Sequence, residues 1–346
     1  MGMNGNYYIN SDIGLPIYKQ VVSQIEQKII SGEYAPGFLL PSMNELSAEL
    51  DISKETIKKA YSILRDKGVI EPRQGKGFYV CKVGDDRRAR ILLLFDKFSS
   101  NKQVLYNSFM SEIGEHAEVT IRIHNQSLDV FELFIDEALD NYDYYVVAPH
   151  FPLDQSSQKR MLRLLKRLPN RKLILVDRNV PELSGNYGVV YQDFENDITD
   201  CLSAVSSELK KFARLNVITL SSSLYGSIIS ASVGKFCTAN GINVEFSNDI
   251  SRDNLRRNEV YLILSSQLET GLLSLARNAR ELGLEIGKDV SVISYNDFPL
   301  NEIIFNGLTA ASTDFEQMGR IAAQMIMEKT PDKVRCPFNL IRRGTF

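Results

Sequence analysis

The side chains best suited to chemistry stand at the start of one predicted helix and in a short basic loop after it. Lys54, Glu55, Thr56 and Lys58 begin the helix, and the loop reads Arg-Gln-Gly-Lys-Gly over 73–77. Lysine donates to guanine or phosphate, glutamate accepts from cytosine N4, and threonine contacts a thymine methyl group or a phosphate. Glycines let the backbone approach a phosphate, and basic side chains suit the edge of a groove. These residue types therefore have the chemistry needed to bind DNA.

Two short helices are predicted immediately before that loop. Ser42 and Glu45 form an S-x-x-E capping box, which starts a helix that ends at Leu50. Ser53 is placed to cap a second helix over 54–66. Only a tight turn fits between the two helices, so together they predict a helix-turn-helix.

The second helix has distinct inner and outer faces. Ile57, Tyr61 and Leu64 recur at helical spacing and are expected to face a core, which turns the first-turn lysines outward. Residues 69–71 and 78–80 then alternate as two short strands around the basic loop. The order of helix, turn, helix and hairpin predicts a winged helix-turn-helix. The alternative, a structural helix pair that happens to carry lysines, is disfavoured because these features follow one another without a gap.

Residues 15–80 closely resemble the N-terminal domain of GntR-type bacterial transcription regulators. The resemblance includes Pro-Ile-Tyr at 16–18, Pro-Gly at 36–37, Leu-Pro-Ser at 40–42 and the Gly-x-Gly of the loop. In that family the DNA contacts come from the starts of the second and third helices and from the wing tip. With the basic loop residues added, the expected DNA-contacting residues are Ser42, Asn44, Ser53, Lys54, Thr56, Lys58, Arg73, Gln74, Gly75 and Lys76.

The chain departs from the family at three of these positions. Many members carry Arg where this sequence has Asn44, Lys54 and Lys58. A guanidinium group binds guanine in a bidentate manner, whereas an ammonium group does not. The operator sequence of an Arg-bearing relative is therefore not expected to apply to this chain.

Length and charge limit the possible classes of protein. A chain of 346 residues suits two or three domains. The formal net charge is −3, which argues against a protein that coats nucleic acid generally. Residues 51–90 nevertheless hold 11 Lys and Arg against 6 Asp and Glu, a local excess of five positive charges. A basic patch on an acidic body fits site-specific DNA binding better than bulk attraction.

Cysteine and histidine usage indicates neither a metal site nor catalysis. The four cysteines are widely spaced, form no C-x-x-C and have no histidine at ligand spacing, which predicts free thiols in a reducing cytoplasm. His116, His124 and His150 are isolated, with no H-E-x-x-H pattern. No signal pattern opens the chain and no apolar run reaches ~18 residues, so no membrane span is expected. We therefore expect no cofactor, no metal, no catalytic residues and no enzymatic activity.

The remainder of the chain alternates apolar strands with amphipathic helices. The charged residues 83–90 are interpreted as a linker between a DNA-binding domain, 1–82, and a second domain, 91–346. Strands are expected at 91–95, 119–123, 144–148, 173–176, 188–191, 217–220, 260–264 and 290–294, with helices between them. Because these strands are apolar throughout, they predict an α/β fold of parallel sheets covered on both faces. About 255 residues of this pattern indicate two lobes, with ligands at the carboxyl ends of the strands.

Residues 90–346 resemble the effector domain of LacI-type regulators, which is related to periplasmic sugar-binding proteins. The resemblance rests on Leu-Val-Asp-Arg at 175–178, the string 283–297, Leu-Thr at 308–309 and Gly-Arg-Ile-Ala-Ala at 319–323. It implies two lobes joined by three chain crossings, a small molecule in the cleft, and a homodimer.

The crossings are expected near 181–187, 296–300 and 307–313. The expected division is therefore lobe 1 from 91–181 with 310–346, and lobe 2 from 182–309.

The sequence departs from the LacI pattern where the ligand sits. Many members have Asn-Asp where this chain has Ser-Ser at 265–266, and an Arg near 230–232 that is missing here. Sugar recognition needs several donors and acceptors around hydroxyl groups. The candidate effector-binding residues, all in loops after strands or near crossings, are Asp96, Asn101, Tyr106, His150, Arg178, Asp193, Tyr225, Gln267 and Asp297. Of these, Arg178, Tyr225 and Asp297 are favoured, and Asp193 could instead cap the helix that begins near Glu195.

These features predict a cytoplasmic, homodimeric transcription regulator, in particular a repressor of a carbohydrate-use operon. It would bind double-stranded operator DNA, and a sugar-like effector between the lobes would switch its affinity. Among regulators with this domain pairing, the resemblance extends to those that control arabinose or fucose use. The alternative is a soluble sugar-binding or sugar-active protein whose N-terminal domain only mediates assembly.

Overall fold

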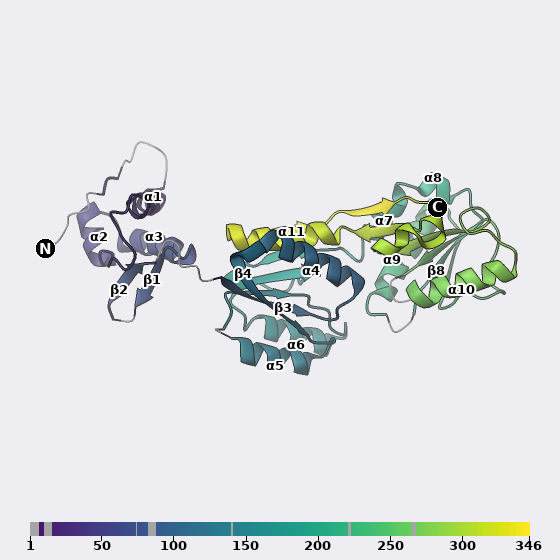
Figure 1. Ribbon diagram of the computed structural model, residues 1–346, viewed down its shortest axis with the longest axis horizontal. Coiled ribbons are helices and arrows are strands. Elements are labelled where there is room, and N and C mark those ends of the chain that lie inside the picture. Colours follow the sequence, from purple (N-terminus) through teal and green to yellow (C-terminus); the bar gives the residue numbers. More distant parts are fainter. Residues whose placement is uncertain are drawn as a thin grey trace. The chain divides into compact units, whose positions relative to one another are not determined.

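The chain divides into two units, residues 1–87 and 88–346, which the computed structural model shows in Figure 1. The structure describes residues 7–9, 16–73, 75–81, 88–139, 141–220, 223–264 and 268–346. The division falls inside the predicted linker 83–90, of which 83–87 lie outside the described residues.

The described part of the first unit is a three-helix domain with a two-stranded hairpin. Both expected caps are confirmed: Ser42 Oγ accepts from the backbone N–H of Glu45 at 3.2 Å, and Glu45 accepts from the Ser42 N–H at 2.8 Å. Ser53 Oγ accepts from the Thr56 N–H at 3.2 Å. The elements are α1 Ile17–Ile30, α2 Met43–Leu50, α3 Lys54–Asp66, β1 Ile70–Arg73 and β2 Gly77–Val80.

The inner face of α3 is the one that its spacing predicts. Ile57, Tyr61 and Leu64 are fully buried in one core with residues of α1 and of the hairpin. The Tyr61 hydroxyl donates to the Pro41 carbonyl oxygen at 2.7 Å, which ties α3 to the segment before α2. Asp51 makes the turn between the helices with a φ of 50°. The buried face therefore leaves the first turn of α3 facing solvent.

Lobe 1 of the second unit is a six-stranded parallel sheet between two pairs of helices. Its strand order is β13-β7-β6-β5-β3-β4. Figure 1 shows α4 and α11 together on one face, and α5 and α6 on the other. The strands are β3 Ala89–Phe95, β4 Ala117–Ile123, β5 Tyr144–Val147, β6 Leu173–Asp177, β7 Gly188–Tyr191 and β13 Lys333–Arg335. The helices are α4 Ser100–Ile113, α5 Leu128–Ala138, α6 Gln155–Leu165 and α11 Phe315–Glu328.

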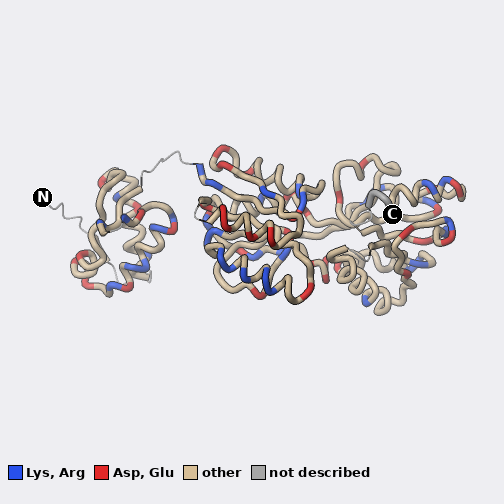
Figure 2. Tube along the Cα trace, turned by 90° about the horizontal axis from the view of Figure 1, so that it is seen from below, with Lys and Arg blue, Asp and Glu red and all other residues tan. Residues whose placement is uncertain are grey.

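Strand β3 shows why this sheet is covered on both faces. Ile91, Leu93 and Phe95 belong to the core beneath α4 and α11. Leu92 and Leu94 belong to the core beneath α5 and α6. Successive side chains of a strand point to opposite faces, so a continuous apolar run requires helices on both. Figure 2 marks the Lys, Arg, Asp and Glu residues along the chain, and they are spread over both lobes of the second unit.

A glycine allows α4 and α11 to pack closely. A Cβ atom at Gly319 would lie 2.2 Å from the carbonyl oxygen of Leu105 and 2.9 Å from the backbone nitrogen of Phe109. No real contact is that short, so only glycine permits this approach. This close packing of α11 against α4 holds α11 in lobe 1.

Lobe 2 has a six-stranded sheet of order β14-β12-β11-β10-β8-β9. Its edge strand β14 runs antiparallel to β12, so the sheet is mixed where the sequence indicates purely parallel pairing. The strands are β8 Arg214–Ile218, β9 Val244–Ser247, β10 Glu259–Ile263, β11 Ser291–Tyr295, β12 Thr309–Thr313 and β14 Phe338–Ile341. The helices are α7 Asp197–Ser203, α8 Ser206–Leu209, α9 Gly226–Asn240 and α10 Leu268–Glu281. One core includes α7 and α9, and the other includes α10.

The crossings between the lobes differ from those expected. Residues 192–196 connect β7 to α7, residue 314 connects β12 to α11, and residues 336–337 connect β13 to β14. The expected crossings at 181–187, 296–300 and 307–313 instead lie within single lobes.

Strand pairing explains the difference. Strand β7 pairs with β6 and so remains in lobe 1, although the sequence interpretation assigns 182–309 to lobe 2. Strand β12 pairs with β11, which places 310–313 in lobe 2 instead of lobe 1. The hydrogen-bonding partner of a strand decides its sheet, and hydropathy does not reveal that partner.

Two further features concern the described residues as a whole. Cys201, Cys237 and Cys336 are free buried thiols, and burial raises the pKa of Cys201 and of Cys237 to about 11. Among the helices that the structure describes, none has the length and apolar content of a membrane span.

Candidate functional site

The first unit exposes most of the residues that are expected to contact DNA. Exposed are Ser42, Asn44, Ser53, Lys54, Lys58, Arg73, Gly75 and Lys76, while Thr56 is half-buried and Gln74 lies outside the described residues. The Ser42 and Ser53 hydroxyl oxygens accept the capping bonds, and the Thr56 hydroxyl lies 2.8 Å from Ser53 Oγ. Each cap marks a helix N-terminus, where backbone N–H groups and the helix dipole favour a phosphate.

The basic side chains of this face are only weakly held. Lys58 Nζ lies 3.5 Å from Glu55, and both side chains are well exposed. Arg73 pairs with Glu71 at 3.1 Å and lies over the Tyr79 ring, 4.5 Å from its centroid. Exposed pairs of this kind contribute about 0–1 kcal/mol, so a phosphate can replace the carboxylate at little cost.

The second unit has a cavity of about 1040 Å³, lined by residues from both lobes. Four of the predicted effector-binding residues line it, namely Asp96, Asn101, His150 and Tyr225. Tyr106, Arg178, Asp193 and Asp297 are not among the lining residues, and Gln267 lies outside the described residues. The structure therefore brings together only part of the predicted set.

Two of the favoured effector-binding candidates, Arg178 and Asp297, make hydrogen bonds to residues that do not line the cavity. Arg178 donates to the Pro149 carbonyl oxygen at 2.8 Å and to Gln158 Oε1 at 2.6 Å, both within lobe 1, and its guanidinium lies 6.0 Å from the centroid of the Tyr225 ring. Asp297 accepts both guanidinium nitrogens of Arg343, at 2.9 and 2.8 Å. These guanidinium and carboxylate groups therefore hold loops in place.

The other two residues away from the cavity also have local roles. Asp193 Oδ1 accepts the backbone N–H groups of Glu195 and Asn196 at 3.1 and 3.2 Å, which supports its alternative interpretation as a cap. Tyr106 packs edge-on against Phe98, with ring centroids 6.0 Å apart.

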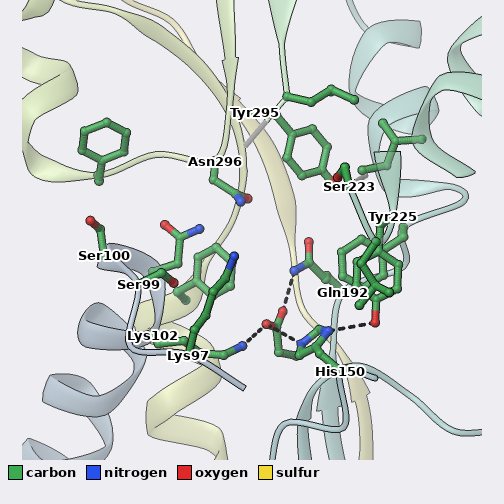
Figure 3. Close-up of a pocket in the computed structure, with 18 of the residues that line it drawn as sticks. Lys97, Ser99, Ser100, Lys102, His150, Gln192, Ser223, Tyr225, Tyr295 and Asn296 are labelled. Atoms are coloured by element: carbon green, nitrogen blue, oxygen red, sulfur yellow. Dashed lines mark hydrogen bonds and ion pairs between the residues drawn. The ribbon is translucent and has the colours of Figure 1, made fainter. Parts of the chain in front are cut away.

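A buried polar network forms the part of the cavity contributed by lobe 1. Asp177 Oδ2 pairs with Lys102 Nζ and lies 2.9 Å from His150 Nε2. Gln192 donates to the other oxygen of Asp177, and Asp96 Oδ1 lies 3.6 Å from Lys102 Nζ. All five side chains are buried. Figure 3 shows Lys102, His150 and Gln192 converging on one carboxylate.

The charges of this network stabilise one another. Burial alone would raise the pKa of Asp177, but the Lys102 ammonium and His150 outweigh it and hold that pKa well below the usual range. Burial likewise would lower the pKa of Lys102, yet Asp177 and Asp96 together raise it. Both groups therefore remain ionised at neutral pH.

The ionised carboxylate determines which histidine nitrogen carries the proton. An ionised carboxylate can only accept, so His150 Nε2 carries hydrogen and donates to Asp177. In a neutral His150 the Nδ1 atom is then an acceptor, and it lies 2.8 Å from the hydroxyl oxygen of Tyr225. Burial raises the pKa of Tyr225, which keeps its hydroxyl protonated and able to donate.

This hydrogen bond joins the two lobes. His150 follows β5 in lobe 1, and Tyr225 stands immediately before α9 in lobe 2. Phe194, in the first crossing, stacks on Tyr225 with ring centroids 3.8 Å apart and planes at 2°. Thr313, next to the second crossing, donates to Gln192 Oε1 at 3.2 Å. A change in the angle between the lobes must therefore act on this group of contacts.

Three buried polar atoms on the cavity wall have no hydrogen-bond partner within the described part of the chain. They are Asn296 Oδ1, the Tyr295 hydroxyl oxygen and Asp96 Oδ1, of which Asp96 Oδ1 is ion-paired with Lys102 Nζ at 3.6 Å. Leaving a buried polar atom unsatisfied costs about 1–3 kcal/mol, so such atoms favour a polar ligand. In Figure 3, Asn296 lies between the side that carries Ser99 and Ser100 and the side that carries Tyr225.

Several of the residues that line the cavity are not among those predicted from the sequence. Lys102 lies within the first turn of α4, and Asp177 precedes the favoured candidate Arg178 in the Leu-Val-Asp-Arg string. Gln192 follows β7, which the sequence interpretation assigns to the other lobe. Their position after a strand is the feature that could have identified them from the sequence. Asp177 ends β6, Gln192 follows β7, and Lys102 lies in the first turn of the helix after β3.

Two family models match parts of the chain. Residues 17–80 match the family described as bacterial regulatory proteins, gntR family. The first unit is a GntR-type helix-turn-helix domain. Residues 269–346 match a second family, described as periplasmic binding protein-like domain.

The GntR-type domain has relatives among named regulators. The HTH-type transcriptional repressor YtrA of Bacillus subtilis (strain 168) is 37% identical over 65 residues, which is 19% of this chain and 50% of YtrA. Across the first three curated relatives, the chain covers between 14% and 55% of their length.

Solved structures share the fold of the second unit. A dimeric lac repressor with an 11-residue C-terminal deletion has a TM-score of 0.58 at 17% identity, covering 74% of this chain and 98% of that one. A LacI family transcriptional regulator from Lactobacillus casei with bound glucose has a TM-score of 0.57 at 15% identity, covering 74% and 99%. At such identity the likeness shows the fold alone, and it confirms the expected two-lobed α/β architecture.

Proposed function

We propose that this chain is a transcription repressor of a carbohydrate-use operon, regulated by a sugar-like effector. One observation carries the proposal: the chain that bears an exposed GntR-type recognition helix also has an interlobe cavity with unsatisfied buried polar atoms, among them Asn296 Oδ1 and the Tyr295 hydroxyl oxygen. Support comes from the repressor name of YtrA and from the glucose-bound LacI family regulator of the same fold.

The GntR-type domain would bind operator DNA through α3 and the wing. The first turn of α3 would enter the major groove, where Lys54 and Lys58 donate to bases or phosphates. Arg73 and Lys76 of the wing would contact the backbone at the edge of the groove. A homodimer would place two such helices on half-sites about one helical turn apart, or a multiple of it.

The effector would bind where the two lobes meet. Its hydroxyl groups would donate to Asp96 Oδ1 on lobe 1 and to Asn296 Oδ1 on lobe 2. Among the described residues Asn296 Oδ1 has no hydrogen-bond partner, and Asp96 Oδ1 has only the Lys102 ammonium at 3.6 Å. A ligand that binds both lobes changes the angle between them, and so the separation of the recognition helices in a dimer. Coupling of this kind is typically ~1–3 kcal/mol, or roughly a 5- to 150-fold change in operator affinity.

The same geometry supports a regulator over an enzyme. Asp177, His150 and Tyr225 form a carboxylate–imidazole–hydroxyl chain, as a nucleophilic site would. The raised pKa of Tyr225 opposes formation of the phenolate, and Lys102 already neutralises Asp177. We infer that this chain of contacts positions the lobes and does not activate a nucleophile.

Operator binding by the full-length chain tests the DNA-binding half of the proposal. The triple variant Lys54→Ala, Lys58→Ala, Arg73→Ala is titrated against the DNA upstream of its own operon at several salt concentrations. We expect weaker binding and a salt slope shallower by about 0.9 for each phosphate contact removed. A matched control removes three exposed lysines of the second unit, Lys159, Lys210 and Lys288. If the two triple variants bind DNA equally well, the GntR-type domain does not bind this DNA as proposed.

The effector half is tested by operator release. Free sugars and sugar phosphates at millimolar concentration are added to the protein–DNA complex, and the variant Asp96→Asn is measured alongside. At least one sugar should change the operator affinity of the wild type and have a weaker effect on the variant. No change with any sugar would contradict the proposed regulation.

A further inference from the structure

The two walls of the interlobe cavity differ in chemical character. The Asp, Lys and His side chains that line it, namely Asp96, Lys97, Lys102, His150 and Asp177, all come from lobe 1. From lobe 2, as far as the structure describes it, no charged side chain lines the cavity. Lobe 2 instead contributes an apolar wall, which we define as Leu272, Leu273, Ala276, Phe298, Leu300 and Phe305.

The apolar wall is held in place from behind. Leu272 belongs to the core beneath α10, and Phe305 packs against that core. Phe305 has a φ of 53°, a strained backbone conformation for a bulky residue that the surrounding structure must maintain. The wall is therefore a fixed surface of lobe 2.

Part of this wall is exposed to an unusual degree. Leu273 on α10 and Leu300 in the segment after β11 are each 57% exposed. Single exposed leucines are ordinary, but two that line the same cavity beside further apolar side chains mark a binding surface. Contact between water and these apolar side chains is unfavourable, and an apolar group of a ligand would displace that water.

We propose that the effector is amphipathic, with a polyhydroxylated head and an apolar substituent, as in an aryl or alkyl glycoside. This inference rests on the proposed function and narrows its effector class. The head binds the polar groups of the cavity, where Asn296 Oδ1 lacks a hydrogen-bond partner among the described residues and Asp96 Oδ1 has only its ion pair with Lys102. The substituent lies on the apolar wall. A cavity of about 1040 Å³ is at the upper end of the usual range for ligand pockets, so it holds a sugar ring together with a further group.

A polar environment on one side and an apolar wall on the other favours such a molecule over a free monosaccharide. A free sugar placed against Leu273 and Leu300 would lose water from hydroxyl groups that these side chains cannot replace. An alkyl or aryl group on the ligand would raise its affinity there, by roughly fourfold for each fully buried methylene group.

The apolar wall is tested first without assuming the identity of the sugar. The neutral apolar dye N-phenyl-1-naphthylamine is titrated into the full-length protein, and its fluorescence reports binding. We expect saturable binding by the wild type and at least tenfold weaker binding by the double variant Leu273→Ser, Leu300→Ser. The matched control Leu133→Ser changes a leucine on α5 that is 53% exposed and does not line the cavity. It should bind the dye like the wild type. Absence of saturable binding, or equal binding by the double variant, overturns the inference.

The effector class is then tested with matched ligands. The methyl, butyl and phenyl β-glycosides of glucose and galactose and the corresponding α-L-arabinosides are compared with the free sugars, by thermal shift and by operator release. Affinity should rise from methyl to butyl to phenyl in at least one series, and Leu273→Ser, Leu300→Ser should flatten that rise. If a free sugar binds as tightly as its phenyl glycoside, the amphipathic effector is excluded while the proposed regulation stands. If the glycosides bind but operator affinity stays constant, the proposed regulation fails and the ligand class is retained.

Discussion

The Tyr225 hydroxyl and His150 Nδ1 lie 2.8 Å apart, and this hydrogen bond joins lobe 2 to lobe 1. Behind it, His150 Nε2 donates to the ionised Asp177, which fixes the orientation of the ring. The contact therefore transmits the position of α9 to the buried charges of the other lobe.

Removing that hydroxyl should weaken the connection between the lobes. We expect Tyr225→Phe to lower the free energy of unfolding by about 1 kcal/mol, because His150 Nδ1 loses its buried donor. We also expect the variant to shift the effector concentration that changes operator affinity. Thermal unfolding and DNA titration measure the two effects. Tyr106→Phe is the matched control, since Tyr106 is half-buried and does not line the cavity. Equal behaviour of the two variants would show that the bond is not part of the switch.

The buried pair of Lys102 and Asp177 should show strong energetic coupling. Lys102→Met leaves Asp177 charged and buried, which should cost about 3–5 kcal/mol. Asp177→Asn should cost a similar amount, and the double variant should cost clearly less than the sum. Urea denaturation of the four proteins closes the double-mutant cycle. Additive losses would mean that the two charges are not coupled as their contact indicates.

His124 should make stability fall in mild acid. It is fully buried, stacks on Phe151 and has a pKa lowered by burial from 6.5 to about 4. Between pH 6.5 and about 4 the unfolded chain binds a proton that the folded chain does not, so stability declines as the pH falls through this window. The decline should total about 3 kcal/mol.

A pair of histidine variants isolates this effect. His124→Phe keeps an aromatic ring in the cluster and removes the titrating group, so the unfolding free energy should depend less on pH across the same window. His116→Asn changes an exposed histidine and should leave the wild-type slope unchanged. A slope that persists in His124→Phe would assign the acid sensitivity to another group.

Gly319 should tolerate no side chain. A Cβ there would lie 2.2 Å from the Leu105 carbonyl oxygen, so Gly319→Ala must separate α11 from α4. We expect a loss of about 1–3 kcal/mol or more in chemical denaturation. The matched control is Gly234→Ala in α9, whose Cβ would meet Phe246 at an ordinary 3.4 Å. That variant should be neutral or more stable by up to about 1 kcal/mol, owing to the helix propensity of alanine. Equal stability of the two variants would show that α11 does not pack as closely as described.

Local patterns in the sequence determined the helix-turn-helix and the hairpin of the first unit. The caps at Ser42 and Ser53, and the buried face of Ile57, Tyr61 and Leu64, depend on residues within one or two helical turns. Interactions at such short range are encoded in spacing. The same holds for the long apolar strands of the second unit, such as β3, whose composition alone requires helices on both faces.

Long-range pairing decided what the sequence left open. Strands β9, β12, β13 and β14 were not expected, because they are short and carry no continuous apolar run. Their pairing determines where the chain crosses between the lobes: β13 joins β7, and β14 joins β12.

The candidate site shows the same division. Position after a strand was enough to select Asp96, Asn101, His150 and Tyr225 as residues near the cavity. It could not distinguish Asp177 from its neighbour Arg178.

Tertiary structure decided between those neighbours. Asp177 has a left-handed φ of 71° and lies against Lys102, which is 75 residues away in sequence. Arg178 turns to Pro149 and Gln158 instead. The direction of a side chain at the end of a strand depends on the local backbone angles. It also depends on which charged residue the fold places beside it. Neither can be determined from the spacing of residues in the sequence.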